Sequence, residues 1–152
     1  MAQLLWRPQM SIGVEVIDSD HRALIDVLNE LDTALGGDVA ALGKEAGLIL
    51  LRMMDYTKEH FRREEAIMAL VKYPHLAEHK REHDRLAAQV QAIAARFLAN
   101  PSAAIGREIY DMLAKWLVEH IIHRDREIVP YIKGEHLREQ LRQGMGALGA
   151  FA

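Results

Sequence analysis

The sequence predicts an all-α protein, an antiparallel up-down-up-down four-helix bundle with an N-terminal arm and a short C-terminal extension. Three observations lead to this prediction. Apolar residues recur every three or four positions in four separate stretches, which is the period of an amphipathic helix. Short connections rich in Gly, Pro or Asn separate these stretches, and none of them alternates with the two-residue period of a strand. Helices joined by short connections pack as antiparallel neighbours.

The length and charge of the chain limit its class. A chain of 152 residues, half of them hydrophobic, can form one domain with a substantial core. We expect a helical domain at residues 1–134 and, at 135–152, a short helix followed by a Gly-rich tail. The net charge of -3 offers no basic surface for nucleic acid. No apolar run approaches the roughly 20 residues of a membrane span, and the start lacks a signal-peptide pattern, so we expect a cytoplasmic protein.

The arm covers about the first 18 residues, in which Pro8 and Gly13 prevent a sustained helical period. Ser19 and Asp20 can cap the first helix, which we expect over residues 19–36 before two glycines end it. The stripe of core positions on this helix consists of His21, Leu24, Leu28, Leu31 and Leu35. A histidine therefore occupies the first core position.

The second and third helices carry two ionisable side chains each at core positions. The second helix is expected to begin at the cap residue Asp38 and to end before Pro74. Its stripe consists of Ile49, Met53, Tyr56, His60, Glu64, Ile67 and Val71. The third helix is expected to begin near Pro74 or His75 and to end at Asn100 and Pro101. Its stripe consists of Leu76, His79, His83, Leu86, Val90, Ile93 and Phe97.

The fourth helix is expected to begin after the cap residue Ser102 and to be disrupted by Pro130. Its stripe consists of Ile105, Ile109, Met112, Trp116, His120 and His123. Asp125 follows His120 by five residues, which on a regular α-helix turns the side chain about 140 degrees away. Either this helix contains a π-type irregularity or Asp125 reaches in from a shifted face. On spacing alone, His123 rather than Asp125 would be the second ligand on this helix, because it follows His120 by three residues.

The ionisable residues at core positions together indicate a metal site. They are His21, His60, Glu64, His79, His83, His120 and Asp125. Each polar group costs a few kcal/mol when it is buried without a partner, and the net stability of a domain is only about 5 to 15 kcal/mol. A single residue of this set could be an ordinary hydrogen-bonded core residue, but recurrence on four helices favours a cation. The chain has no cysteine, so nitrogen and oxygen atoms must bind it.

Four segments contain these residues: IDSDHRALI, EHFRREE, HKREH and WLVEHIIHRD. Their order of H, HFxxE, HxxxH and HxxxxD resembles the hemerythrin family, in particular the short bacterial single-domain hemerythrins. The resemblance extends from about Trp6 to Tyr131. It implies a four-helix bundle that binds dioxygen at two non-haem iron ions joined by an oxo or hydroxo bridge. The chain departs from the pattern at Asp20, where many relatives carry Gln.

The resemblance also implies a role for each residue. One iron would be bound by His79, His83 and His120, the other by His21 and His60, and both by the bridging carboxylates Glu64 and Asp125. His123 would then lie beside the ligands or at the surface. Dioxygen would occupy an open position on the iron with two histidines. Phe61, Trp116 and Leu117 match the lining of the family's oxygen pocket, although ordinary core packing would also explain them.

These expectations favour reversible dioxygen binding for carriage, storage or delivery over an enzymatic activity. One alternative is an oxygen, redox or iron sensor that acts through a partner, and another is a di-iron oxidase or a peroxide or nitric oxide reductase. The imidazole-rich ligand set favours binding, because ferritin-like oxidases use carboxylate-rich sites. Two carboxylates in the same layer disfavour haem, and zinc needs only about four ligands. The expected partners are dioxygen and either an oxygen-consuming enzyme or a signalling partner.

Overall fold

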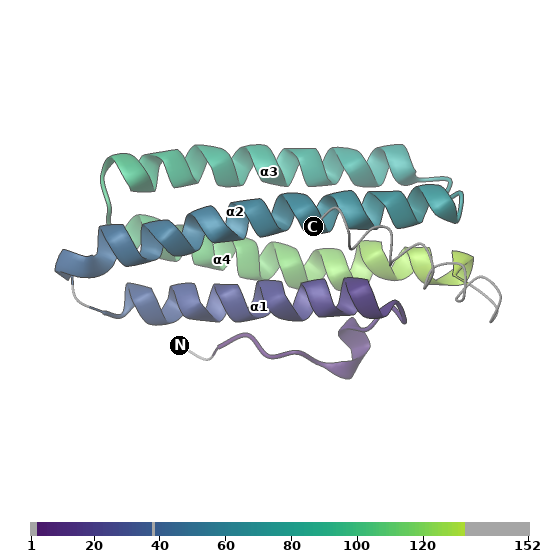
Figure 1. Cartoon of the computed structure of the whole chain (residues 1–152), viewed down its shortest axis with the longest axis horizontal. Helices are drawn as coiled ribbons and strands as arrows, with labels where there is room; N and C mark the ends of the chain where they lie inside the picture. Colours follow the sequence, from purple (N-terminus) through teal and green to yellow (C-terminus); the bar gives the residue numbers. More distant parts are fainter. Residues whose placement is uncertain (1–2, 38, 133–152) are drawn as a thin grey trace.

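The computed structural model describes residues 3–37 and 39–132, without the side chains of residues 39–42. Four long helices run alternately in opposite directions (Figure 1). They are α1 (Glu15–Leu35), α2 (Val39–Leu70), α3 (Leu76–Ala99) and α4 (Ala103–Glu119). The residues described contain no strand, so the predicted all-α up-down-up-down bundle is confirmed. The predicted C-terminal extension lies outside the described residues.

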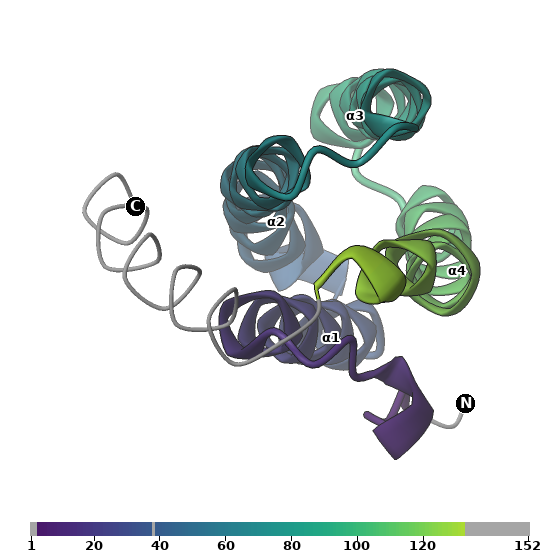
Figure 2. The same ribbon diagram turned by 90° about the vertical axis from the view of Figure 1, so that its right-hand side faces the viewer.

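The four helices stand at the corners of a square when the bundle is viewed end-on (Figure 2). Helix α1 packs against α2 and α4, and α3 packs against the same two helices. Each helix therefore turns one stripe of side chains toward a shared interior. In the part of the chain that is described, no helix combines the length and apolarity that a membrane span requires.

The N-terminal arm lies along α1, as predicted (Figure 1). It contains one 3-10 turn, Pro8–Met10. The backbone N–H of Leu4 donates to Asn29 Oδ1 at 3.0 Å, and the Asn29 amide donates to the Leu4 carbonyl at 2.9 Å. Nearer the start of the helix, the N–H of Ile12 donates to the carboxylate of Asp18 at 2.9 Å. These bonds attach both ends of the arm to α1.

Helix α1 begins at Glu15, four residues before the predicted start, so the prediction that Ser19 and Asp20 cap it is wrong. Val14 stands at the N-cap without a side-chain hydrogen bond. The physical reason is that Ile17, which is fully buried, extends the apolar stripe by one turn. Asp20 lies inside the helix and is itself buried.

The other helix ends agree more closely with prediction. Helix α2 ends at Leu70, before Pro74, and the proposed cap Asp38 lies outside the described residues. Lys72 has a positive φ of 56°, which lets the chain reverse direction toward α3. Ser102 caps α4 as predicted, and its hydroxyl accepts a hydrogen bond from the backbone N–H of Ile105 at 3.4 Å.

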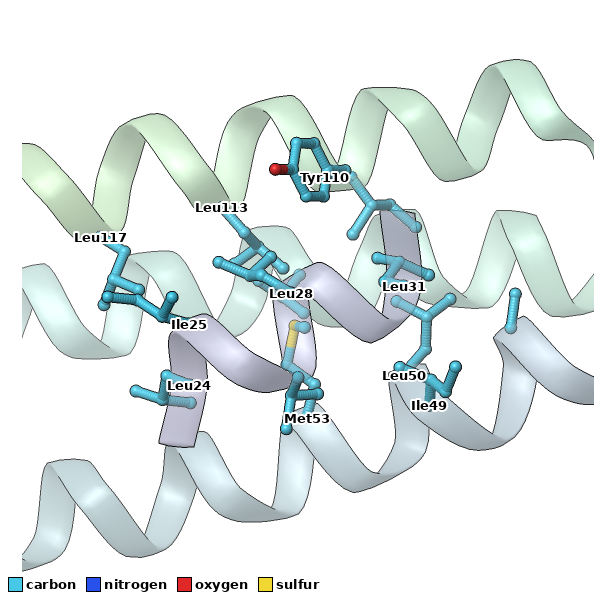
Figure 3. Close-up of a cluster of buried hydrophobic side chains, with 14 of the residues drawn as sticks. Leu24, Ile25, Leu28, Leu31, Ile49, Leu50, Met53, Tyr110, Leu113 and Leu117 are labelled. Carbon is cyan, nitrogen blue, oxygen red and sulfur yellow. The ribbon is translucent and has the colours of Figure 1, made fainter. Parts of the chain in front are cut away.

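Two apolar clusters form the core, with a polar layer between them. The larger cluster includes Leu24, Ile25, Leu28, Leu31, Ile49, Leu50, Met53, Tyr110, Leu113 and Leu117 (Figure 3). The smaller one consists of Ile12, Val14, Ile17, Ile67, Met68, Tyr73, Ile128 and Ile132. On α1, His21 stands between Ile17 of the smaller cluster and Leu24 of the larger. On α2, His60 and Glu64 stand between Met53 of the larger cluster and Ile67 of the smaller, and after α4, His120 and Asp125 stand between Leu117 and Ile128. The side chains of these ionisable residues therefore meet in one layer.

Candidate metal centre

All seven predicted ligands lie in this polar layer, and each is at most 4% exposed. Their nitrogen and oxygen atoms form two overlapping groups, in each of which all atoms lie within 4.8 Å of one another. The first group consists of Glu64, His79, His83, His120 and Asp125, and the second of His21, His60, Glu64 and Asp125. The two carboxylates belong to both groups. This division is the one that the family resemblance implies.

Glu64 directs one carboxylate oxygen toward each group. Its Oε1 atom lies 2.7 Å from His79 Nε2 and 3.2 Å from His83 Nε2. Its Oε2 atom lies 3.4 Å from His60 Nε2 and 3.7 Å from His21 Nε2. A carboxylate placed in this way can join two cations, one on either side.

Asp125 completes the layer because α4 continues into a π-helical turn, His120–Arg124. The backbone N–H of Asp125 donates to the carbonyl of His120, five residues earlier, as well as to that of Ile121, four residues earlier, whereas an α-helix has only the contact four residues earlier. The wider turn brings Asp125 back to the face of His120. Its Oδ1 atom lies 3.0 Å from His120 Nε2, and its Oδ2 atom lies 3.1 Å from His21 Nε2. Of the two explanations for the five-residue spacing, the structure therefore shows the π-type irregularity.

The spacing of the nitrogen atoms fits a shared cation. His120 Nε2 lies 3.0 Å from His79 Nε2 and 3.1 Å from His83 Nε2. Ligand atoms about 2.1 Å from one centre and at right angles to each other are about 3.0 Å apart. Three converging imidazole nitrogens cannot all be satisfied by hydrogen bonds to one another, because each neutral ring offers either a proton or a lone pair at a given nitrogen.

Unpartnered atoms in the layer lead to the same conclusion. Among the described residues, five buried side-chain atoms have no hydrogen bond of acceptable geometry: His21 Nδ1 and Nε2, Glu64 Oε2, and Asp125 Oδ1 and Oδ2. Buried polar atoms in native proteins nearly always have a partner. Imidazole nitrogens and carboxylate oxygens in two overlapping groups form a donor set suited to two iron ions. The residues present therefore fit a di-iron centre.

The charges in the layer are strongly coupled. Burial alone would lower the pKa of His79, but Asp125 and Glu64 outweigh this effect and raise the pKa to about 10. The same two carboxylates raise the pKa values of His21 and His120 to about 9. Conversely, the histidines hold the pKa values of both carboxyl groups below their ordinary range, although burial opposes this. A metal ion that enters this layer must therefore displace protons from imidazoles.

Three of the five histidines also have a carboxylate on the side away from the layer. These pairs are His60 with Asp20 at 3.0 Å, His83 with Glu65 at 2.9 Å, and His120 with Glu82 at 3.5 Å. In each pair the acid comes from the preceding long helix: Asp20 on α1 contacts α2, Glu65 on α2 contacts α3, and Glu82 on α3 contacts the π-helical turn that follows α4. These pairs were not predicted from the sequence. A signal was available, because each acid stands directly beside a predicted ligand in the chain.

The three predicted pocket residues line one apolar cavity of about 20 Å³. This is room for about one molecule of the size of water. Phe61 stacks on the imidazole of His83 with the rings 3.8 Å apart, and Trp116 stacks on that of His120 at 4.2 Å. Leu117 is buried beside them. The other lining residues are Leu24, Leu28, Met53, Thr57, Leu86 and Leu113.

Leu24 also lines this cavity and was not predicted from the sequence, although it follows His21 by three residues and so shares its helix face. His123 is exposed and lies in neither group of ligand atoms. It stands at the surface next to His120, because the π-helical turn directs Asp125 rather than His123 into the layer.

Comparison with known proteins finds similarity along most of the chain. The family described as Hemerythrin HHE cation binding domain matches residues 12–132. A bacteriohemerythrin from Stenotrophomonas maltophilia is 34% identical over 143 residues, which are 94% of this chain and 90% of that protein. One from Methylococcus capsulatus is 31% identical over 83% of this chain and 94% of its own length. A crystal structure of wild-type hemerythrin superposes with a TM-score of 0.73 at 30% identity, covering 88% of this chain and 100% of that one.

Proposed function

Because the chain belongs to the hemerythrin family, we propose that it binds dioxygen reversibly at a non-haem di-iron centre and serves to carry, store or deliver oxygen. The observation that carries this proposal is the division of the oxygen atoms of Glu64 and Asp125 between two groups of histidines. The proposed iron ligands are His21, His60, Glu64, His79, His83, His120 and Asp125. An oxo or hydroxo bridge between the ions is part of the proposal.

The unequal number of histidines in the two groups supports a position for dioxygen. Three imidazoles face one side of the carboxylates and two face the other, which comprises His21 and His60. Octahedral coordination is therefore less complete on the side with two histidines. The two ferrous ions would supply the two electrons that bind dioxygen reversibly. The chain supplies the ligands, and it limits what else can reach them.

The apolar cavity supports binding without further reaction. Phe61, Trp116 and Leu117 keep its volume near that of one water molecule, so bulk water is excluded from the side of the layer that they cover. Thr57 also lines the cavity, but its hydroxyl donates to the carbonyl of Met53 at 2.7 Å. This engaged hydroxyl has no proton to offer to a bound molecule. A small apolar cavity with few available protons favours release of dioxygen over its reduction.

The test is to measure iron per chain and then to record the optical spectrum of the reduced protein through repeated exposure to oxygen and vacuum. We expect two irons per chain and a spectrum that returns after each cycle. Irreversible oxidation in the first exposure would contradict reversible carriage and favour a sensor or an enzyme. A purified chain that folds fully in the presence of ample iron but binds none would contradict the di-iron centre itself.

A further inference from the structure

A buried ion pair stands directly behind one proposed ligand. Asp20 and Arg63 are only 4% and 6% exposed. Arg63 Nε donates to Asp20 Oδ2 at 2.9 Å, and Arg63 Nη2 donates to Asp20 Oδ1 at 2.8 Å. The hydroxyl of Tyr56 donates to Asp20 Oδ1 at 3.0 Å, and His60 Nδ1 lies 3.0 Å from Asp20 Oδ2. Each oxygen of Asp20 therefore has two partners.

The helices bring these groups together in a simple way. Tyr56, His60 and Arg63 follow one another at intervals of four and three residues, so they share one face of α2. Asp20 precedes His21 on α1 and is rotated from it by about 100 degrees. His21 consequently points into the polar layer, whereas Asp20 points toward α2. One turn of α1 thus contributes both a proposed ligand and the partner of a second one.

The contacts of Asp20 determine which nitrogen of His60 carries the proton. The guanidinium fork keeps Asp20 ionised, and an ionised carboxylate only accepts hydrogen bonds. His60 Nδ1 must therefore carry the proton, and its N–H donates a hydrogen bond to Asp20. A neutral ring then has its lone pair at Nε2, the atom that faces Glu64 Oε2 at 3.4 Å. Asp20 thus determines both the tautomer and the orientation of this imidazole.

The other two carboxylates behind histidines are held less firmly. The side chains of Glu65 and Glu82 are 21% and 27% exposed, against 6% for that of Asp20. Arg124, which pairs with Glu82 at 3.0 Å, has a side chain that is 53% exposed. Water can therefore replace or loosen these contacts. Only behind His60, among the described residues, is the carboxylate enclosed and bound by both arms of a guanidinium.

We propose that Asp20, bound by Arg63 and Tyr56, is a positioning residue that presents Nε2 of His60 to the metal on the side with two histidines. This inference rests on the proposed function, because it assumes a metal in the polar layer. The positive charge of Arg63 offsets the negative charge of Asp20, so the pair orients His60 without adding net negative charge to the centre. Loss of the carboxylate should weaken binding of one of the two metal ions much more than the other.

The first experiment measures metal binding by Asp20→Asn in the full-length chain. We expect the affinity of one ferrous ion, measured under nitrogen by competition with a chelator, to fall about 10- to 100-fold, while the other ion stays bound. The matched control is Asp18→Asn. Asp18 is equally buried on the same helix and accepts hydrogen bonds from Ser11 and Ile12, but it contacts no proposed ligand. The Asp18→Asn variant should have a lower free energy of unfolding and unchanged affinities for both ferrous ions.

The second experiment does not depend on iron. Nitrogen-15 spectra of the metal-free chain report which nitrogen of His60 is protonated, and we expect Nδ1 in the wild type and a shift toward Nε2 in Asp20→Asn. Should Asp20→Asn fail to fold, Tyr56→Phe removes a single hydrogen bond and should weaken the same ion about fivefold.

The proposal is overturned if Asp20→Asn keeps wild-type affinity for both ions, if Asp18→Asn weakens metal binding equally, or if the tautomer is unchanged. A wild type that binds two irons but does not cycle with oxygen would contradict the proposed function and leave this inference standing.

Discussion

Truncation of Leu117 to alanine tests the role of the apolar cavity. Leu117 is 5% exposed and lines the cavity of about 20 Å³ above the polar layer. Leu→Ala removes three carbon atoms, and such changes in a core cost about 2 to 5 kcal/mol of stability. A domain with a net stability of about 5 to 15 kcal/mol should remain folded. The enlarged cavity would admit additional water, each molecule of which occupies about 30 Å³ in the liquid.

The expected result is faster autoxidation, by about tenfold or more, because added water lowers the barrier to irreversible oxidation by at least about 1.4 kcal/mol. The assay follows the optical spectrum of the oxygenated protein over time at constant temperature. Leu31→Ala is the matched control, since Leu31 is fully buried in the same apolar cluster but does not line the cavity. An unchanged rate in Leu117→Ala would refute the role of the cavity. An equal acceleration in Leu31→Ala would instead attribute the effect to general destabilisation.

Three further predictions concern the metal ligands. His123→Ala should keep two irons per chain, whereas His120→Ala should lose at least one. Metal analysis of the purified variants tests this, and loss of iron in His123→Ala would mean that His123 is a ligand. Glu64→Gln should lose both irons, because Glu64 faces both groups of ligand atoms. Glu65→Gln should retain both irons with weaker binding, because Glu65 contacts only His83 of the proposed ligands. Equal loss of iron in the two variants would argue against Glu64 as a bridge between the ions. In the metal-free protein, His79 has its pKa raised from 6.5 to about 10, so its stabilising contribution is complete below about pH 6.5 and is lost as the pH rises through 10. Urea unfolding at pH 6 and pH 10.5 should show this loss for the metal-free protein only, and equal stability at the two values would contradict the coupling.

Much of the fold was predictable because helices depend on local periodicity. The three-four alternation of apolar residues located four helices, and Ser102 located the start of the last one correctly. The same alternation identified His21 and His60 as ionisable residues at core positions, where they are indeed buried. Proline and glycine between the stretches predicted short connections, from which the antiparallel order follows. These features are encoded within a few residues of chain, so the sequence carries them directly.

Helix ends and side-chain directions near an irregularity were less predictable. The sequence suggested Ser19 and Asp20 as caps, but burial of Ile17 against the smaller cluster extends α1 by a turn. The spacing of His120 and Asp125 was compatible with two local solutions. The structure contains the π-helical turn, in which both side chains point into the same layer.

The sequence by itself therefore determined which ionisable residues lie in the polar layer, and hence that the core contains a site suited to a cation. Only the tertiary structure decided how these residues are paired across helices. The contact between Asp20 and His60 joins positions 40 residues apart, and it depends on the relative height of α1 and α2 in the bundle. No local pattern specifies that height, because it results from the packing of whole helix faces against one another.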